Sequence, residues 1–112
     1  MSGFIVRDEN REWSSANWVY WGFMDHVIEA LKDSPEIAHR AEGCKWMQIL
    51  GFDTLAEEDA LVAEKILGVC RTVASKCSNG DLLCKVDNRV LDGESQKQFR
   101  EAMQELEALL DN

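Results

Sequence analysis

The side chains best suited to chemistry in this chain are its cysteines, Cys44, Cys70, Cys77 and Cys84. No two of them form a C-x-x-C motif, which disfavours both a zinc ribbon and a redox-active dithiol. On one helix Cys70 and Cys77 lie about 10 Å apart, too far for a disulfide. We therefore expect buried free thiols in a reducing compartment. A Cys77–Cys84 bridge across the turn at 78–80 stays open as the alternative.

The two histidines, His26 and His39, offer little support for a metal centre. Glu36 precedes His39 by three residues, which is half of the ligand motif of di-iron helical bundles. Such sites need the motif twice, and Phe23 stands where His26 would need its glutamate. The sequence therefore predicts no metal site and no cofactor.

Nucleophilic and phosphate-binding motifs are also missing: the chain has no G-x-S-x-G, G-x-G-x-x-G or Walker pattern. The acidic run 57–59 falls in the first turn of a predicted helix, where negative charge is stabilising. Asp59 also lies on that helix's apolar side, which favours a structural role, such as a hydrogen bond to a neighbouring cap, over a place at the rim of an interface. We expect a protein that is not an enzyme. An enzyme or small-ligand carrier that uses a pocket between helices is a third class, supported only by the aromatic content.

Composition narrows the class of partner. The chain has 112 residues, 46% of them hydrophobic, and a net charge of −9 that both halves share. This charge repels nucleic acid and anionic membranes, and it favours encounter with a basic protein, although acidity also serves plain solubility. No apolar run reaches the ~18 residues of a membrane span, and the first residues do not resemble a secretory signal. We expect a cytoplasmic protein.

The periodicity of apolar residues predicts an all-α fold, a compact single-domain bundle of about four main helices over residues 1–112. Helix-start signals are Ser14 or Ser15, Ser34-Pro35-Glu36, the capping box at 54–57 and a similar pattern at 95–98. The predicted helices lie near residues 15–33, 35–50, 55–77 and 95–110.

Two segments remain open in this prediction. Phe4-Ile5-Val6 could form a short strand or an extended N-terminal arm that packs on the helices. Residues 81–91 could form a short helix capped by Asp81, or an extended stretch before the turn at Asp92-Gly93.

Trp18 is the aromatic residue that fits the predicted core least well. Drawn as a helix, residues 16–32 place their apolar side chains on one side: Tyr20, Met24, Val27, Ile28 and Leu31. Trp18 falls opposite them, among Gly22, Asp25 and Glu29. Either the N-terminal arm covers this indole or a partner does, since tryptophans ringed by polar groups are typical binding hot spots.

The remaining tryptophans have more ordinary interpretations. Trp21 lies at the edge of the apolar face and is expected in the core, Trp46 fits either role, and Trp13 can staple the helix start. The expected contact set is Trp18, Asp25 and Glu29, with Trp13 and His26 at its edge.

In size, acidity and lack of catalytic motifs, the chain resembles bacterial immunity proteins and antitoxins that act on nuclease toxins. No motif carries this resemblance, so no residue role follows from it. It implies a non-catalytic inhibitor whose acidic face blocks the cationic active site of a basic toxin. The alternative is a homo-oligomeric structural or regulatory protein, such as a homodimer, whose tryptophan-rich face packs against its own copy.

Overall fold

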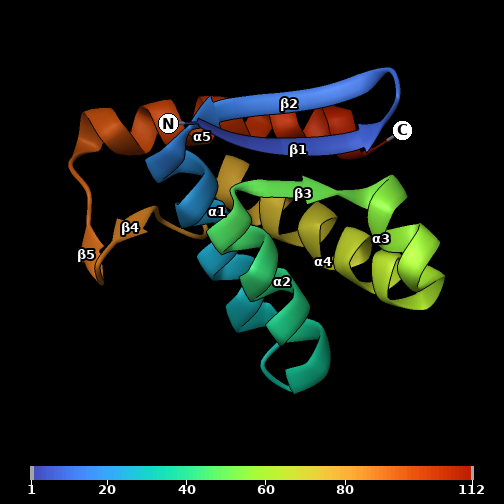
Figure 1. The fold of residues 1–112 in the computed structure, drawn as a ribbon. Helices are drawn as coiled ribbons and strands as arrows, with labels where there is room; N and C mark the ends of the chain where they lie inside the picture. Colours follow the sequence, from blue (N-terminus) through green and yellow to red (C-terminus); the bar gives the residue numbers. More distant parts are fainter. Residues whose placement is uncertain (1, 112) are drawn as a thin grey trace.

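A computed structural model describes residues 2–111 and combines five helices with two small sheets (Figure 1). The helices are α1 (Asn17–Ala30), α2 (Pro35–Met47), α3 (Phe52–Glu58), α4 (Ala60–Ser78) and α5 (Gly93–Leu110). The strands are β1 (Ser2–Asp8), β2 (Arg11–Ala16), β3 (Ile49–Gly51), β4 (Lys85–Val86) and β5 (Arg89–Val90). The prediction of an all-α bundle is therefore wrong: the fold is a compact mixture of helices and strands.

The N-terminal segment forms a β-hairpin, so of the two open alternatives for Phe4-Ile5-Val6 the strand is confirmed and the arm is wrong. β1 and β2 pair antiparallel, and alternate residues point inward, so that Ile5 and its cross-strand partner Trp13 are both buried. This period of two is the strand period. Ser14 and Ser15, predicted to cap the first helix, belong to β2, and α1 follows it directly with no side-chain cap.

The second predicted helix, expected to reach residue 50, ends at Met47. Gln48 adopts a left-handed conformation with φ of 62°, which terminates α2. Ile49–Gly51 then pairs in parallel with Phe4–Val6, giving the sheet order β2-β1-β3. Leu50 is buried in this strand. Its partner strand is distant in the sequence, so no local pattern predicts the pairing.

The predicted helix 55–77 is in fact two helices. The backbone of Asp59 is extended, and its carboxylate accepts hydrogen bonds from the backbone amides of Leu61 and Val62. Asp59 thus caps α4. Its role is structural, as expected, but the sequence prediction did not identify it as the start of a new helix. Thr54, expected to open the helix, lies inside α3.

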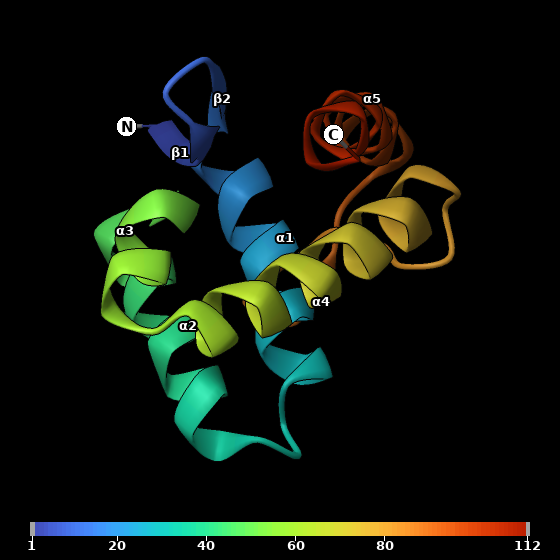
Figure 2. The same ribbon diagram turned by 90° about the vertical axis from the view of Figure 1, so that its right-hand side faces the viewer.

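α1 lies at the centre of the molecule, surrounded by the N-terminal hairpin, α2 and α4 (Figure 2). α5 packs along α4 and against β2. Its apolar side chains at helical spacing face inward, and Phe99, Met103, Leu106 and Leu110 are all fully buried. Within residues 2–111, no helix combines the length and the apolar character needed to span a bilayer.

Residues 81–91, left open by the sequence, contain the β4–β5 hairpin. Asp87 and Asn88 both have positive φ, the two-residue turn that matches the twist of paired strands. Gln96, buried in α5, fixes the residue just before β4. The Gln96 side-chain NH2 group donates to the Cys84 carbonyl, and the Gln96 side-chain carbonyl accepts from the Cys84 amide, both at 2.8 Å. The segment therefore has a defined position over α1.

Candidate functional site

Three tryptophans, Trp18 and Trp21 of α1 and Trp46 of α2, line one surface cavity of about 510 Å³. We call this cavity the tryptophan pocket. Its other lining residues come from the β2–α1 junction, the middle of α1, the end of α2 and the β4–β5 hairpin: Ala16, Asn17, Asp25, Lys45, Lys85, Val86 and Asp87. The pocket thus depends on three segments that are far apart in the sequence.

An ion pair between Lys45 and Asp25 organises one wall of the tryptophan pocket. The Lys45 ammonium lies 2.7 Å from Oδ1 of Asp25, and the Lys45 side chain is only 16% exposed. The same ammonium lies 5.2 Å from the ring centre of Trp21 and 5.1 Å from that of Trp46. Both distances are typical of cation–π contacts. The two indoles also meet edge to face, with ring centres 5.2 Å apart.

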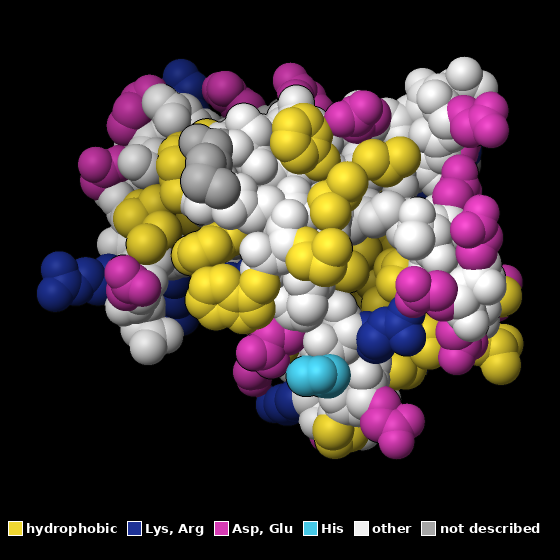
Figure 3. Space-filling view, in the orientation of Figure 1, with side chains coloured by type: hydrophobic (Ala, Val, Ile, Leu, Met, Phe, Trp, Pro, Cys, Tyr) yellow, Lys and Arg dark blue, Asp and Glu magenta, His cyan; other side chains and the backbone are white. Residues whose placement is uncertain are grey.

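Local structure explains why Lys45 and Trp46 are available for this wall. Lys45 occupies the last turn of α2, where the helix dipole favours a positive charge. The helix ends two residues later, which leaves Trp46 61% exposed and Met47 74% exposed. Figure 3 shows hydrophobic side chains gathered across the middle of the face that carries α1, α2 and β3, with Asp and Glu side chains around them.

Trp18 does not stand free on a charged flank, as the helical wheel suggested. Gly22, its neighbour one turn along α1, is buried beneath the segment before β4: a Cβ at this glycine would lie 2.6 Å from the Cys84 sulfur. Trp18 itself is half-buried against the core and forms part of the pocket wall.

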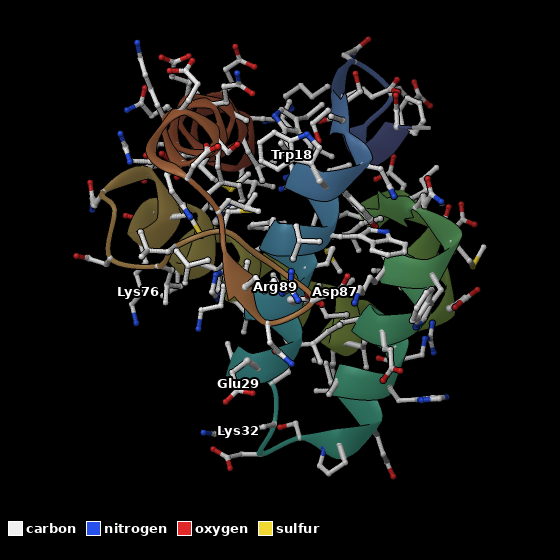
Figure 4. The ribbon with its side chains drawn as sticks, turned by 90° about the vertical axis from the view of Figure 1, so that its left-hand side faces the viewer. Trp18, Glu29, Lys32, Lys76, Asp87 and Arg89 are labelled. Atoms are coloured by element: carbon white, nitrogen blue, oxygen red, sulfur yellow. The ribbon has the colours of Figure 1, made fainter. Side chains whose placement is uncertain are left out.

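The structure brings together only part of the predicted contact set. Asp25 lies in the tryptophan pocket with Trp18, whereas Glu29 lies at the far end of α1, beside Lys32 (Figure 4). His26 anchors the chain before β4, because its Nε2 donates to the Leu83 carbonyl at 2.7 Å. Trp13 is 5% exposed within the core, so its indole is not available to a partner.

The sequence interpretation missed Trp21 and Lys45 and left Trp46 undecided. Trp21 was expected in the core, yet it faces Lys45 and Trp46 in the pocket wall. One signal was available: Lys45, Trp46 and Met47 follow each other at the end of a helix, and three such residues cannot all face the core. The contact between Trp21 and Trp46, however, joins two helices and has no local signature.

The cysteines offer no reactive group. All four lie within the described residues and are free thiols, so Cys77 and Cys84 do not form a bridge in this structure. Burial raises the pKa of Cys77 to about 12 and that of Cys84 to about 11, from an ordinary value of 9.0. Both thiols are therefore protonated and poorly nucleophilic near neutral pH.

From the raised pKa values of these two thiols we expect the free energy of unfolding to fall in alkaline solution. A raised pKa means that the folded protein keeps protons that the unfolded chain releases. The stabilisation is complete below the ordinary pKa of 9.0 and is lost as the pH rises toward about 11 for Cys84 and 12 for Cys77. Urea unfolding near neutral pH and at about pH 10 should show this loss. A variant with alanine at both positions should lose less; an identical loss in both proteins would contradict the prediction.

Within residues 2–111, no three or more His, Cys, Asp or Glu side chains lie together in a way that could hold a metal ion. The tryptophan pocket combines aromatic and charged side chains on one surface. Comparison of this chain with known protein families, with curated proteins and with solved structures gave no significant match.

Proposed function

We propose that this chain is a non-catalytic protein-binding module whose contact surface is centred on the tryptophan pocket. The observation that carries the proposal is the position of Trp46. Its indole is 61% exposed yet held in place by Trp21 and Lys45. A large aromatic side chain that is already ordered loses little conformational entropy on binding, which is why such residues act as anchors.

The partner that suits this surface is a basic protein. The chain carries a net charge of −9, and such a field speeds encounter with an opposite charge. A cytoplasmic inhibitor that neutralises a basic nuclease-type toxin, as immunity proteins and antitoxins do, fits these properties. A nuclease gene adjacent to the gene for this chain, and inhibition of that nuclease by the purified chain, would support this narrower class.

Trp46→Ala should weaken binding with little effect on folding. We expect affinity for the partner to fall by about 2 kcal/mol or more, roughly 30-fold, because hot-spot tryptophans have effects of this size. The melting temperature should barely change, since most of the Trp46 side chain is in solvent. The partner would first be isolated from the native cell with the wild-type chain as bait, and affinity then measured by calorimetry with purified proteins.

Leu61→Ala is the matched control, because Leu61 is an exposed apolar residue at the start of α4, outside the pocket. It should bind as the wild type does. An acidic partner, or one that binds Trp46→Ala with undiminished affinity, would refute the proposal. Trp18→Ala is a poorer test, because Trp18 also packs against the core and its loss should lower stability as well.

Self-association is the second candidate function, and one observation favours it. Near Trp46, the exposed apolar residues Met47 and Ile49 continue the surface, and Ile49 pairs with Phe4 across the sheet. A second copy of the chain could cover this group. Sedimentation over a range of concentrations separates the two candidates: a dimer that Trp46→Ala dissociates supports self-association, and a monomer at high concentration removes it.

A further inference from the structure

The tryptophan pocket already holds one cation, the Lys45 ammonium, against two indole rings and a carboxylate. We infer that it accepts a second cation, the guanidinium group of an arginine on the partner. This inference rests on the proposed function and names the chemistry that the binding site recognises.

Carboxylates on two sides of the pocket remain available to such a group. Asp25 is 50% exposed, and Lys45 is its one ion-pair partner within residues 2–111, through Oδ1. Asp87 approaches from the β4–β5 turn and forms no ion pair with any residue of the described chain. A planar guanidinium can donate to a carboxylate through two N–H groups at once.

The third indole supplies the stacking surface. Trp21 and Trp46 contact Lys45 and each other, whereas Trp18 has no ring or cation partner within residues 2–111. Trp18 nevertheless lines the same cavity. Arginine stacks on aromatic faces and is more weakly hydrated than lysine, so it gains more from this wall. The pocket volume of about 510 Å³ leaves room for a guanidinium group.

Lys45 opposes the incoming arginine. Its ammonium repels a second cation and competes with it for Asp25. A cation therefore binds only if its stacking and hydrogen bonds outweigh this repulsion, which makes the pocket selective. An anionic ligand would use the pocket in the opposite way, through Lys45 and Lys85. The nearly buried Lys45 charge is already neutralised by Asp25, whereas half of Asp25 is open to solvent, which favours the cation. The sign of the Lys45 effect on binding therefore tests the inference.

The experiment titrates the full chain with three synthetic peptides that alternate glycine with arginine, lysine or glutamate, and it follows tryptophan fluorescence. Lys45→Met should bind the arginine peptide about fivefold more tightly than the wild type, because it removes one like charge from the pocket. Asp25→Asn should bind it about fivefold more weakly, because it removes the carboxylate. The lysine peptide should bind more weakly than the arginine peptide throughout.

Two control variants make the same changes in net charge outside the pocket. Lys97→Met removes an exposed lysine of α5, and Asp53→Asn removes an exposed aspartate of α3. Both should bind the arginine peptide within about twofold of the wild type, since distant exposed charges are screened by salt. Near-ultraviolet circular dichroism of each variant shows whether the tryptophans keep their packing.

Each result bears on the inference. Equal binding of the arginine peptide by the wild type and all four variants overturns it, and the proposed function stands, with a diffuse acidic surface as the attraction. A second outcome also overturns it: the wild type prefers the glutamate peptide, and Lys45→Met binds that peptide more weakly. The pocket would then bind anions. If none of the peptides binds, the pocket inference fails, while the Trp46→Ala measurement on the native partner still decides the proposed function.

Discussion

Gly3→Ala should lower the free energy of unfolding by about 3 kcal/mol, the upper part of the range for overpacking a core. Gly3 lies in β1, directly over α1, and a Cβ at this position would overlap Cβ and Cγ of Tyr20. Tyr20 is fully buried and cannot turn aside into solvent. Its hydroxyl also donates to the Cys44 carbonyl at 2.7 Å, so moving the ring disturbs the last turn of α2.

Gly68→Ala is the control for this substitution. Gly68 lies within α4, and a Cβ there meets nothing within 4 Å. The same change should therefore stabilise the protein by up to about 1 kcal/mol, through the higher helix propensity of alanine. Chemical unfolding of the two variants gives both values. If Gly3→Ala is as stable as the wild type, the close packing of β1 on α1 is incorrect.

Gly3→Ala should also affect the tryptophan pocket. Lys45 and Trp46 directly follow Cys44, the residue whose carbonyl Tyr20 holds. A shift of this turn changes the distance between the Lys45 ammonium and Asp25. We therefore expect Gly3→Ala to weaken binding of the proposed partner, although Gly3 does not line the pocket.

Gln96→Leu should lower the free energy of unfolding by about 1 to 3 kcal/mol, because it leaves the buried Cys84 amide without a partner. The Cys84 carbonyl loses one of its two donors and keeps the other, the Leu91 amide. The Gln96 side chain satisfies both the amide and the carbonyl of Cys84, and it also donates to the Leu91 carbonyl at 3.3 Å. Leucine has similar volume but makes none of these bonds. The segment between Cys84 and Leu91, which carries Lys85 and Asp87 of the pocket, should then open more often.

Hydrogen exchange measures this opening directly. The amides of residues 84–91 should exchange faster in Gln96→Leu than expected from the loss of global stability alone. Gln98→Leu, an equivalent change at an exposed position of the same helix, should leave both stability and exchange nearly unchanged. Unaltered exchange in Gln96→Leu would show that other contacts hold the hairpin.

Several elements were predictable because their signals are local. Pro35 marks the start of α2, and the apolar positions of α5 identify its buried face. The turn at Asp87-Asn88 also has a local signal, since both residues tolerate positive φ. Its flanking strands have only two residues each, too few to show an alternating pattern. The break at Asp59 was visible only as an acidic residue on an apolar stripe.

The candidate site was predicted in part. Trp18 and Asp25 lie in the tryptophan pocket, as members of the expected contact set, because both are on α1 and their relative position follows from helix geometry. Trp46 and Lys45 belong to another helix, so their approach to Trp21 depends on how α2 packs. The helical wheel also treated the flank of Gly22 as open, whereas residues from the chain before β4 cover it.

By itself, the sequence determined the acidic character of the chain, most helix positions and the inward face of α5. These follow from composition and from contacts within a few residues along the chain. The tertiary structure alone decided the parallel pairing of β3 with β1, the burial of Trp13 and the assembly of the tryptophan pocket. Each of these joins segments that are distant in sequence, so their free energy of contact appears only once the chain has packed.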